Sequence, residues 1–81
     1  MPPFKLTSVL RVEFYKRHER RRDVLFCDIT TRQGVISAHE RLSHWDELIR
    51  KLEFLGGFDV EWFLHLSPPE AERYVAFERK G

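Results

Sequence analysis

The sequence predicts a small α+β domain: an antiparallel sheet of three to four strands with one long and one short helix on one face, in the order β-β-β-α-α-β. Three observations predict this fold class. Apolar and polar side chains first alternate with a period of two, and an apolar stripe with the spacing of an α-helix follows. The length of 81 residues suits one domain, so residues 1–81 are expected to form a single unit.

Three segments alternate in the manner of half-buried strands, at residues 4–15, 24–31 and 35–42. In each of them, apolar side chains recur at every second position. Gly34 separates the second segment from the third and suits a tight turn that needs a positive φ. We therefore expect a meander of three antiparallel strands.

The next segment has helical spacing. Its apolar residues recur three and four positions apart, at Trp45, Leu48, Ile49, Leu52 and Leu55. Ser43 can cap the start of this long helix, and two glycines, Gly56 and Gly57, can end it. The apolar stripe is expected to pack against the second strand, which contributes three side chains to the predicted core: Leu25, Cys27 and Ile29.

The short second helix is expected to begin at Asp59 and to end before Ser67, which precedes Pro68 and is disfavoured in the α conformation. The last segment, residues 73–79, leaves two alternatives. Its β-branched and aromatic residues favour a strand, whereas Ser67 with Glu70 has the spacing of a helix capping box. The strand is the favoured alternative.

Composition is that of a folded chain, since 42% of the residues are hydrophobic and 33% are charged. The single cysteine, Cys27, excludes an internal disulfide and favours a reducing, cytoplasmic location. The sequence has no secretory leader pattern, and no apolar run approaches the roughly 18 residues of a membrane span. We therefore expect a cytoplasmic protein with no membrane partner.

Basic residues cluster at positions 16–22, which hold five of the fourteen Lys and Arg residues. Clustered cations beside an aromatic ring can bind phosphates while the ring stacks on a base. The candidate nucleic-acid-binding residues are Tyr15, Lys16, Arg17, Arg20, Arg21 and Arg22. The alternative is a solvated connection between two strands, where charge also opposes edge-to-edge aggregation. We favour this structural role.

A second cluster is aromatic and lies in residues 54–66. It is too apolar on too many sides for one short helix to bury completely, and exposed aromatic anchors are favoured at protein interfaces. The candidate partner-binding residues are Phe54, Phe58, Trp62 and Phe63. Because Trp62 and Phe63 are neighbours on a helix, their side chains point about 100° apart. At least one of them is expected to be partly exposed.

No residue pattern predicts catalysis, a metal site or a cofactor. The histidines and the cysteine lack the CxxC or HxxxH spacing of metal ligands. Cys27 has apolar neighbours that raise a thiol pKa, so we expect it to be unreactive. The Gly56-Gly57 pair follows a helix, whereas a phosphate-binding loop precedes one. We therefore expect a protein that is not an enzyme.

The chain resembles a family of small bacterial proteins that has no assigned activity. The resemblance depends on Glu13 to Arg17, Val24 to Asp28, His39-Glu40, Trp45, Leu48 to Phe58, Trp62-Phe63 and Pro68-Pro69. It implies a stand-alone bacterial domain and no particular site. A more distant similarity is to bacterial pleckstrin-homology-like domains, which also run strands into an amphipathic helix. Fewer strands precede Trp45 here, so no binding residues are transferred from that fold.

These observations favour a non-enzymatic protein-interaction domain that binds another protein or a second copy of itself. The alternative function is a nucleic-acid-binding module that uses the basic segment, residues 16–22. An enzyme or small-ligand binder ranks last, because no set of chemically suited residues supports it.

Overall fold

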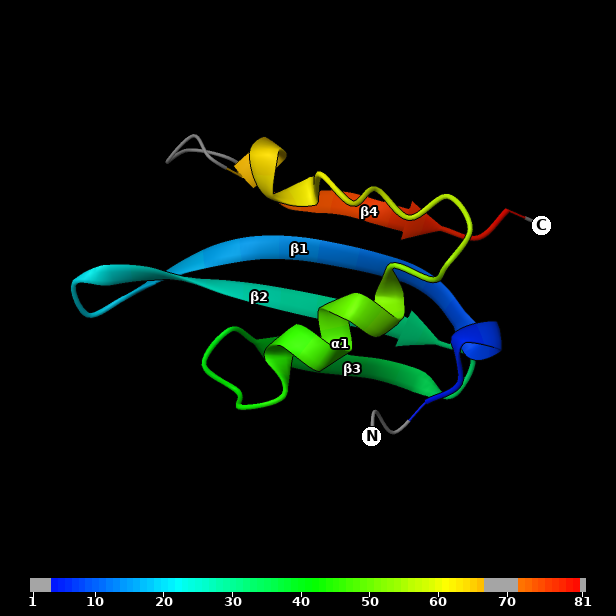
Figure 1. Ribbon diagram of the computed structural model, residues 1–81. Coiled ribbons are helices and arrows are strands. Elements are labelled where there is room, and N and C mark those ends of the chain that lie inside the picture. Colours follow the sequence, from blue (N-terminus) through cyan, green and yellow to red (C-terminus); the bar gives the residue numbers. More distant parts are fainter. Residues whose placement is uncertain (1–3, 67–71, 81) are drawn as a thin grey trace.

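The computed structural model describes residues 4–66 and 72–80. It contains a four-stranded antiparallel sheet in the order β3-β2-β1-β4, with α1 packed across one face (Figure 1). The strands are β1 (Val9–Glu19), β2 (Arg22–Thr31), β3 (Gly34–His39) and β4 (Tyr74–Glu78). The predicted α+β class is confirmed, but within the described ranges only one α-helix is present where two were expected.

The β1–β2 hairpin is the longest element of the sheet. Its register runs from Val9 opposite Thr31 to Glu19 opposite Arg22, with an irregularity between Val9 and Arg11. The predicted start of the first strand at residue 4 was wrong, because residues Leu6–Ser8 form a 3₁₀ turn. This turn is closed by Ser8, whose backbone N–H and hydroxyl both donate to the carbonyl of Lys5.

β3 follows a tight turn in which Gly34 has a φ of 139°, the positive value expected there. The Thr31 hydroxyl donates to the Gly34 carbonyl and accepts from the backbone N–H of Gln33, which fixes the turn. At the other edge, β4 pairs with β1 between Arg11 and Phe14. The strand alternative for the last segment is therefore confirmed.

The helix α1 (Trp45–Leu52) is shorter than the predicted long helix. Ser43 does not cap it: the residue before the helix is His44, and its side chain makes no capping hydrogen bond. The chain leaves helical geometry after Glu53, and Gly57 continues the reversal with a φ of 88°. The opposite charges at its ends, Asp46 and Arg50 among them, still complement the helix dipole.

The predicted second helix is also corrected, because Trp62–Leu66 is a 3₁₀ helix, η2. Asp59 directs this outcome: its carboxylate accepts the backbone N–H of Glu61, which closes a turn just before η2. The backbone N–H of Asp59 also donates to the carbonyl of Ala76 in β4. Only a few residues then remain before Pro68, too few for a stable α-helix.

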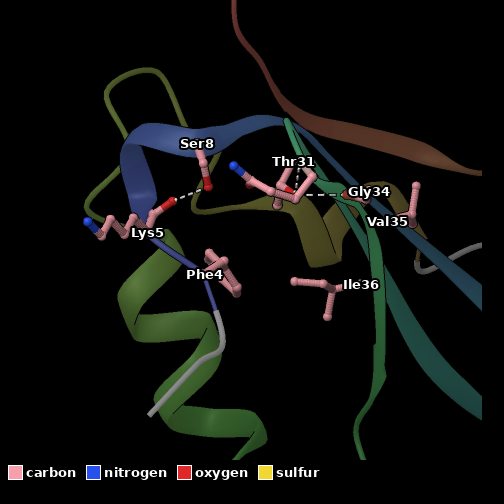
Figure 2. Close-up of a pocket in the computed structure, with 8 residues that line it drawn as sticks. Phe4, Lys5, Ser8, Thr31, Gly34, Val35 and Ile36 are labelled. Atoms are coloured by element: carbon pink, nitrogen blue, oxygen red, sulfur yellow. Dashed lines mark hydrogen bonds between the residues drawn. The ribbon is translucent and has the colours of Figure 1, made fainter.

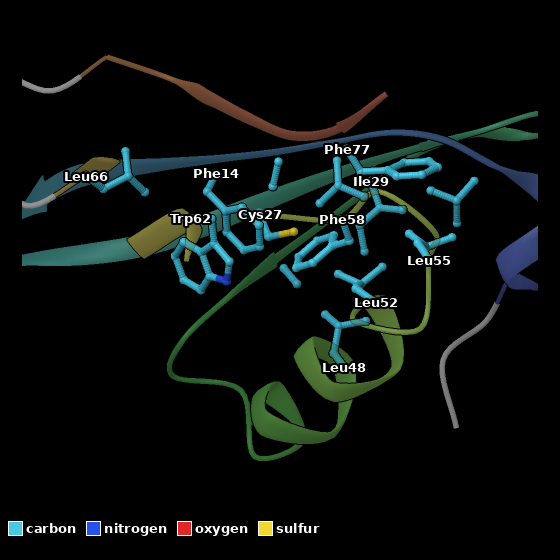
Figure 3. Close-up of a cluster of buried hydrophobic side chains, with 14 residues drawn as sticks. Phe14, Cys27, Ile29, Leu48, Leu52, Leu55, Phe58, Trp62, Leu66 and Phe77 are labelled. Carbon is cyan, nitrogen blue, oxygen red and sulfur yellow. The ribbon is translucent and has the colours of Figure 1, made fainter. Parts of the chain in front are cut away.

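The core lies between α1, η2 and one face of the sheet, with Phe14 of β1 near its centre (Figure 3). The predicted core residues Cys27, Ile29, Leu48 and Leu52 are buried. Others pack against this cluster and are only partly buried: Leu25, Trp45 and Ile49. The convergence of the two periodicities on one core is confirmed.

Candidate interaction surfaces

A shallow groove separates α1 from η2. Its apolar walls are Trp45 and Ile49 of α1 and Trp62 of η2, and its volume is about 420 Å³. The remaining lining residues are charged: Asp46, Arg50 and Glu53. The groove therefore combines aromatic and aliphatic side chains with charged ones, and most of its exposed surface is polar.

The four candidate aromatic residues divide into two buried and two exposed rings. Phe58 and Trp62 are only 8% and 6% exposed, whereas Phe54 is 81% and Phe63 is 51% exposed. The expectation that Trp62 and Phe63 cannot both be buried is confirmed. Two neighbours of these rings are also more than half exposed, Val60 and Leu64, and Val60 was missed because an isolated valine carries no sequence signal.

The buried rings hold the wall of the groove in place. Trp62 stacks on Phe14 with the ring centroids 3.7 Å apart, and Phe58 meets Phe14 edge to face at 6.2 Å (Figure 3). Phe63 contacts the edge of Trp62 at 6.0 Å and so extends the groove wall toward solvent. On the α1 side, Phe54 forms a smaller hollow with Arg50 and Glu53. We call Phe54, Phe63 and the groove between them the aromatic surface.

A network of hydrogen bonds joins Asp59 at the start of η2 to its surroundings. The Tyr74 hydroxyl donates to the Asp59 carboxylate, and His65 stacks on the Tyr74 ring at 4.1 Å. The hydrogen bond from Tyr74, followed by the one from the Glu61 backbone, lowers the pKa of Asp59. These contacts connect η2 to β4 and so position Trp62 and Phe63.

The basic segment lies at the distal end of the β1–β2 hairpin. Arg20 and Arg21 form its two-residue turn, and Arg22 begins β2. All three residues are exposed. The one carboxylate of the segment, Glu19, lies 3.6 Å from Arg41, and the next residue after the segment, Asp23, lies 3.3 Å from the His18 ring. The predicted location in a connection between strands holds only for Arg20 and Arg21, because residues 16–19 belong to β1 and Arg22 begins β2.

The sixth candidate of that set, Tyr15, lies on the sheet face opposite α1 and is already engaged. It stacks on Phe26 at 5.5 Å, and the Arg73 guanidinium lies 4.2 Å from its ring centroid. Its hydroxyl donates to Asp28, and burial followed by the charge of Asp28 raises its pKa. Phe26 and Arg73 thus already contact the Tyr15 ring, and the hollow beside it is shared with Lys16 and Glu72.

Arg73 organises this open face of the sheet. It donates to Glu13 at 2.7 Å and to Asp28 at 2.6 Å, and Ser37 also donates to Asp28. Burial alone would raise the pKa of Asp28, but the hydrogen bonds from Arg73 and Ser37 outweigh it and hold that pKa below its usual value. Sequence reasoning missed the network, since its members are up to 60 residues apart and show no local pattern.

Cys27 is buried in the core, and burial raises the pKa of its thiol well above the usual range. Among the described residues, no group of three or more His, Cys, Asp and Glu is placed to hold a metal ion.

A separate hollow lies near the N-terminal segment, with Phe4 and Ile36 on opposite sides of it (Figure 2). Over the described part of the chain, no helix has the length and apolar character needed to cross a membrane.

Comparisons of the chain with family models, with curated proteins and with solved structures gave no significant match. The surfaces described above are therefore interpreted from their own geometry and chemistry.

Proposed function

We propose that the protein is a non-enzymatic interaction domain and that the aromatic surface is its contact site for another protein. The observation that carries this proposal is the exposure of Phe54 and Phe63, 81% and 51%. Phe63 contacts Trp62 of the groove, and Phe54 shares a hollow with Arg50 and Glu53, which also line the groove. Burying a phenylalanine side chain is worth about 1.5 to 3 kcal/mol. Phe54 and Phe63 remain largely in contact with water in this structure. A partner that buries these two rings would therefore gain much of that free energy on binding.

The surroundings of these rings fit the same function. Trp62 is fixed by its stack on Phe14, and Asp59 is tied to Tyr74, so the groove wall is largely preformed. A preformed surface loses little conformational entropy on binding. The rim offers both signs of charge, from Asp46 and Glu53 and from Arg50, which can orient a partner through complementary charges.

The titratable groups support a binding role over a catalytic one. Asp28 and Glu13 are both paired with Arg73, and Asp59 is paired with Tyr74, while the Cys27 thiol is buried. Nucleophilic catalysis needs a nucleophile beside a base in a pocket. The groove lining has two carboxylates, Asp46 and Glu53, but no serine, threonine, cysteine, histidine or lysine beside them. The single, buried thiol also supports the cytoplasmic location included in this proposal.

The test is affinity capture from extracts of the source organism, with proteins quantified by mass spectrometry. The baits are the wild type, the Phe54→Glu/Phe63→Glu double variant and a Val35→Glu control. Val35 is an exposed apolar residue on β3, outside the aromatic surface, so the control makes the same kind of change elsewhere.

We expect a protein captured by the wild type and by Val35→Glu but reduced at least tenfold with the double variant. Circular dichroism of all three baits establishes that they are folded. Equal capture by the double variant and the wild type would contradict the proposal, as would equal losses in the double variant and the control.

A further inference from the structure

The distal end of the β1–β2 hairpin projects from the rest of the molecule (Figure 1). β3 pairs with β2 only from Phe26 to Thr31, and β4 pairs with β1 only from Arg11 to Phe14. Among the residues that the structure describes, the last hairpin pairs, from Arg17 opposite Val24 to Glu19 opposite Arg22, therefore have no neighbouring strand. We call residues 17–23 the ribbon tip.

The ribbon tip concentrates positive charge. It contains four arginines and two carboxylates, and the carboxylates lie beside His18 and Arg41. Within residues 4–66 and 72–80, no ion pair joins Arg20, Arg21 or Arg22 to a carboxylate. These three guanidinium groups are exposed and available to an anionic partner.

The backbone of the turn keeps the tip narrow. Arg20 has a φ of 56°, which is uncommon for a residue other than glycine and is required in a two-residue hairpin turn. A two-residue turn leaves the strands at their ordinary spacing up to the end of the hairpin. The arginines are thus held at the end of a slender arm.

We propose that the ribbon tip binds duplex nucleic acid by entering the major groove, with its arginines on the flanking phosphates. The major groove is about 12 Å wide and admits a two-stranded ribbon. From Arg17 to Arg20 the tip projects about 10 Å at roughly 3.3 Å per residue, more than the groove depth of about 8.5 Å. The arm is therefore long enough to reach base edges while the body of the protein stays outside.

Other polyanions fit the tip less well. Single-stranded nucleic acid is usually held by stacking on aromatic rings. The rings beside the tip, Phe26 and Tyr15, already stack on each other, with Arg17 over Phe26 and Arg73 over Tyr15. Membrane-inserting loops carry apolar side chains at their ends, and residues 17–23 contain none. A duplex needs neither feature.

The acidic remainder of the protein does not prevent this contact. Glu13 lies six residues along β1 from Glu19, about 20 Å at the rise of a strand. Interactions between exposed charges are largely screened beyond about 8 to 10 Å at ordinary ionic strength. Glu13 and Asp28 are moreover paired with Arg73. Glu40 lies nearer, since its carboxylate accepts from the backbone N–H of Leu25, two residues from the tip. The four arginines of the tip nevertheless outnumber the carboxylates at Glu19, Asp23 and Glu40.

The test is fluorescence anisotropy with a fluorescein-labelled 20-base-pair DNA duplex and a 20-nucleotide oligothymidine. Three to four phosphate contacts predict that duplex affinity falls roughly 40- to 150-fold between 50 and 200 mM salt. The variant Arg20→Glu/Arg21→Glu/Arg22→Glu should lose at least 30-fold in affinity at 50 mM salt. The control Lys5→Glu/Arg32→Glu/Lys80→Glu makes the same change in net charge away from the tip, and should lose less than about threefold.

Equal losses in the two triple variants would overturn the proposal, because binding would then follow net charge and not the tip. Tighter binding to oligothymidine than to the duplex, or to phosphatidylserine vesicles than to either, would overturn it as well. If the charge-reversed tip is unfolded by circular dichroism, the neutral variant Arg20→Asn/Arg21→Gln/Arg22→Gln replaces it, since asparagine tolerates a positive φ. Unchanged duplex affinity in that variant would also refute the proposal, which stands independently of the aromatic surface.

Discussion

The aromatic surface and the ribbon tip are both exposed, yet they are connected to the fold in opposite ways. Trp62 forms part of the groove wall and also stacks on Phe14 in the core, so the aromatic surface is the outer layer of the core. The ribbon tip pairs with no third strand in the described part of the chain, and it lies outside the core cluster. A substitution in the aromatic surface can therefore impair binding or folding, depending on whether the replaced ring is exposed or buried. A substitution in the ribbon tip should leave the stability of the fold nearly unchanged.

The largest expected change in stability distinguishes the rings of the core from the rings of the aromatic surface. Phe14→Ala should lower the free energy of unfolding by about 3 to 5 kcal/mol, because this fully buried ring contacts Trp45, Phe58 and Trp62. Phe54→Ala should change it by less than about 0.5 kcal/mol. Urea denaturation measures both. A similar loss in the two variants would erase the distinction between core and surface rings.

The reactivity of the Cys27 thiol measures how well the core is closed on the side of β2. Because its thiol is buried and burial raises its pKa, labelling by a thiol reagent at pH 8 should be at least a hundredfold slower in the native protein than in denaturant. In Phe14→Ala the rate should increase, since labelling requires opening of the core. Fast labelling of the folded wild type would contradict the assignment of β2 to the core.

A smaller effect is expected on the open face of the sheet. The folded-state pKa of Asp28 is depressed, so its stabilising contribution is fully present above about pH 4 and is lost as the pH falls through the folded-state value. Asp28→Asn should lower stability at pH 7 by about 1 kcal/mol, since half-exposed Arg73 is partly screened. Between pH 5 and pH 2.5 the wild type should lose more stability than Asp28→Asn. Parallel pH profiles would show that the Arg73 network contributes nothing.

The smallest effects are expected at the two candidate surfaces themselves. Phe63→Glu should cost less than about 1 kcal/mol, and charge reversal at Arg20, Arg21 and Arg22 less than about 0.5 kcal/mol. Trp62→Glu should be severely destabilising, because it places a charge where a buried ring stacks on Phe14. The midpoints of thermal unfolding rank the three variants by their loss of stability. Equal stability of Trp62→Glu and Phe63→Glu would mean that the two rings are not divided between core and surface.

The sequence predicts the parts of this fold that repeat at short range. Alternation identifies the strands, and the spacing of Leu48 and Leu52 identifies α1, because each pattern expresses one buried face. The end of β1 was missed because its last residues are polar on both faces, so no alternation exists there. The predicted second helix became 3₁₀ because Asp59 closes a turn with Glu61, a local hydrogen bond that hydrophobic spacing does not reveal.

The candidate sites show the same limit more clearly. Sequence reasoning found the aromatic cluster but had no means to divide it, since the burial of Phe58 and Trp62 depends on Phe14, more than forty residues earlier. It also assigned Tyr15 to the basic cluster by proximity in sequence. Arg73 from the far end of the chain occupies that ring instead, and such long-range pairings leave no trace in a single sequence.

Site-specific photo-crosslinking in living cells of the source organism tests whether a partner protein covers the aromatic surface. Benzoylphenylalanine replaces Phe54 in one variant and Val35 in another, two exposed apolar positions on different parts of the molecule. The account predicts that irradiation produces a discrete crosslinked species from position 54, containing a partner protein, and none from position 35. Adducts at position 35 equal to those at position 54, or no adduct from position 54, would contradict the assignment of the aromatic surface as a contact site.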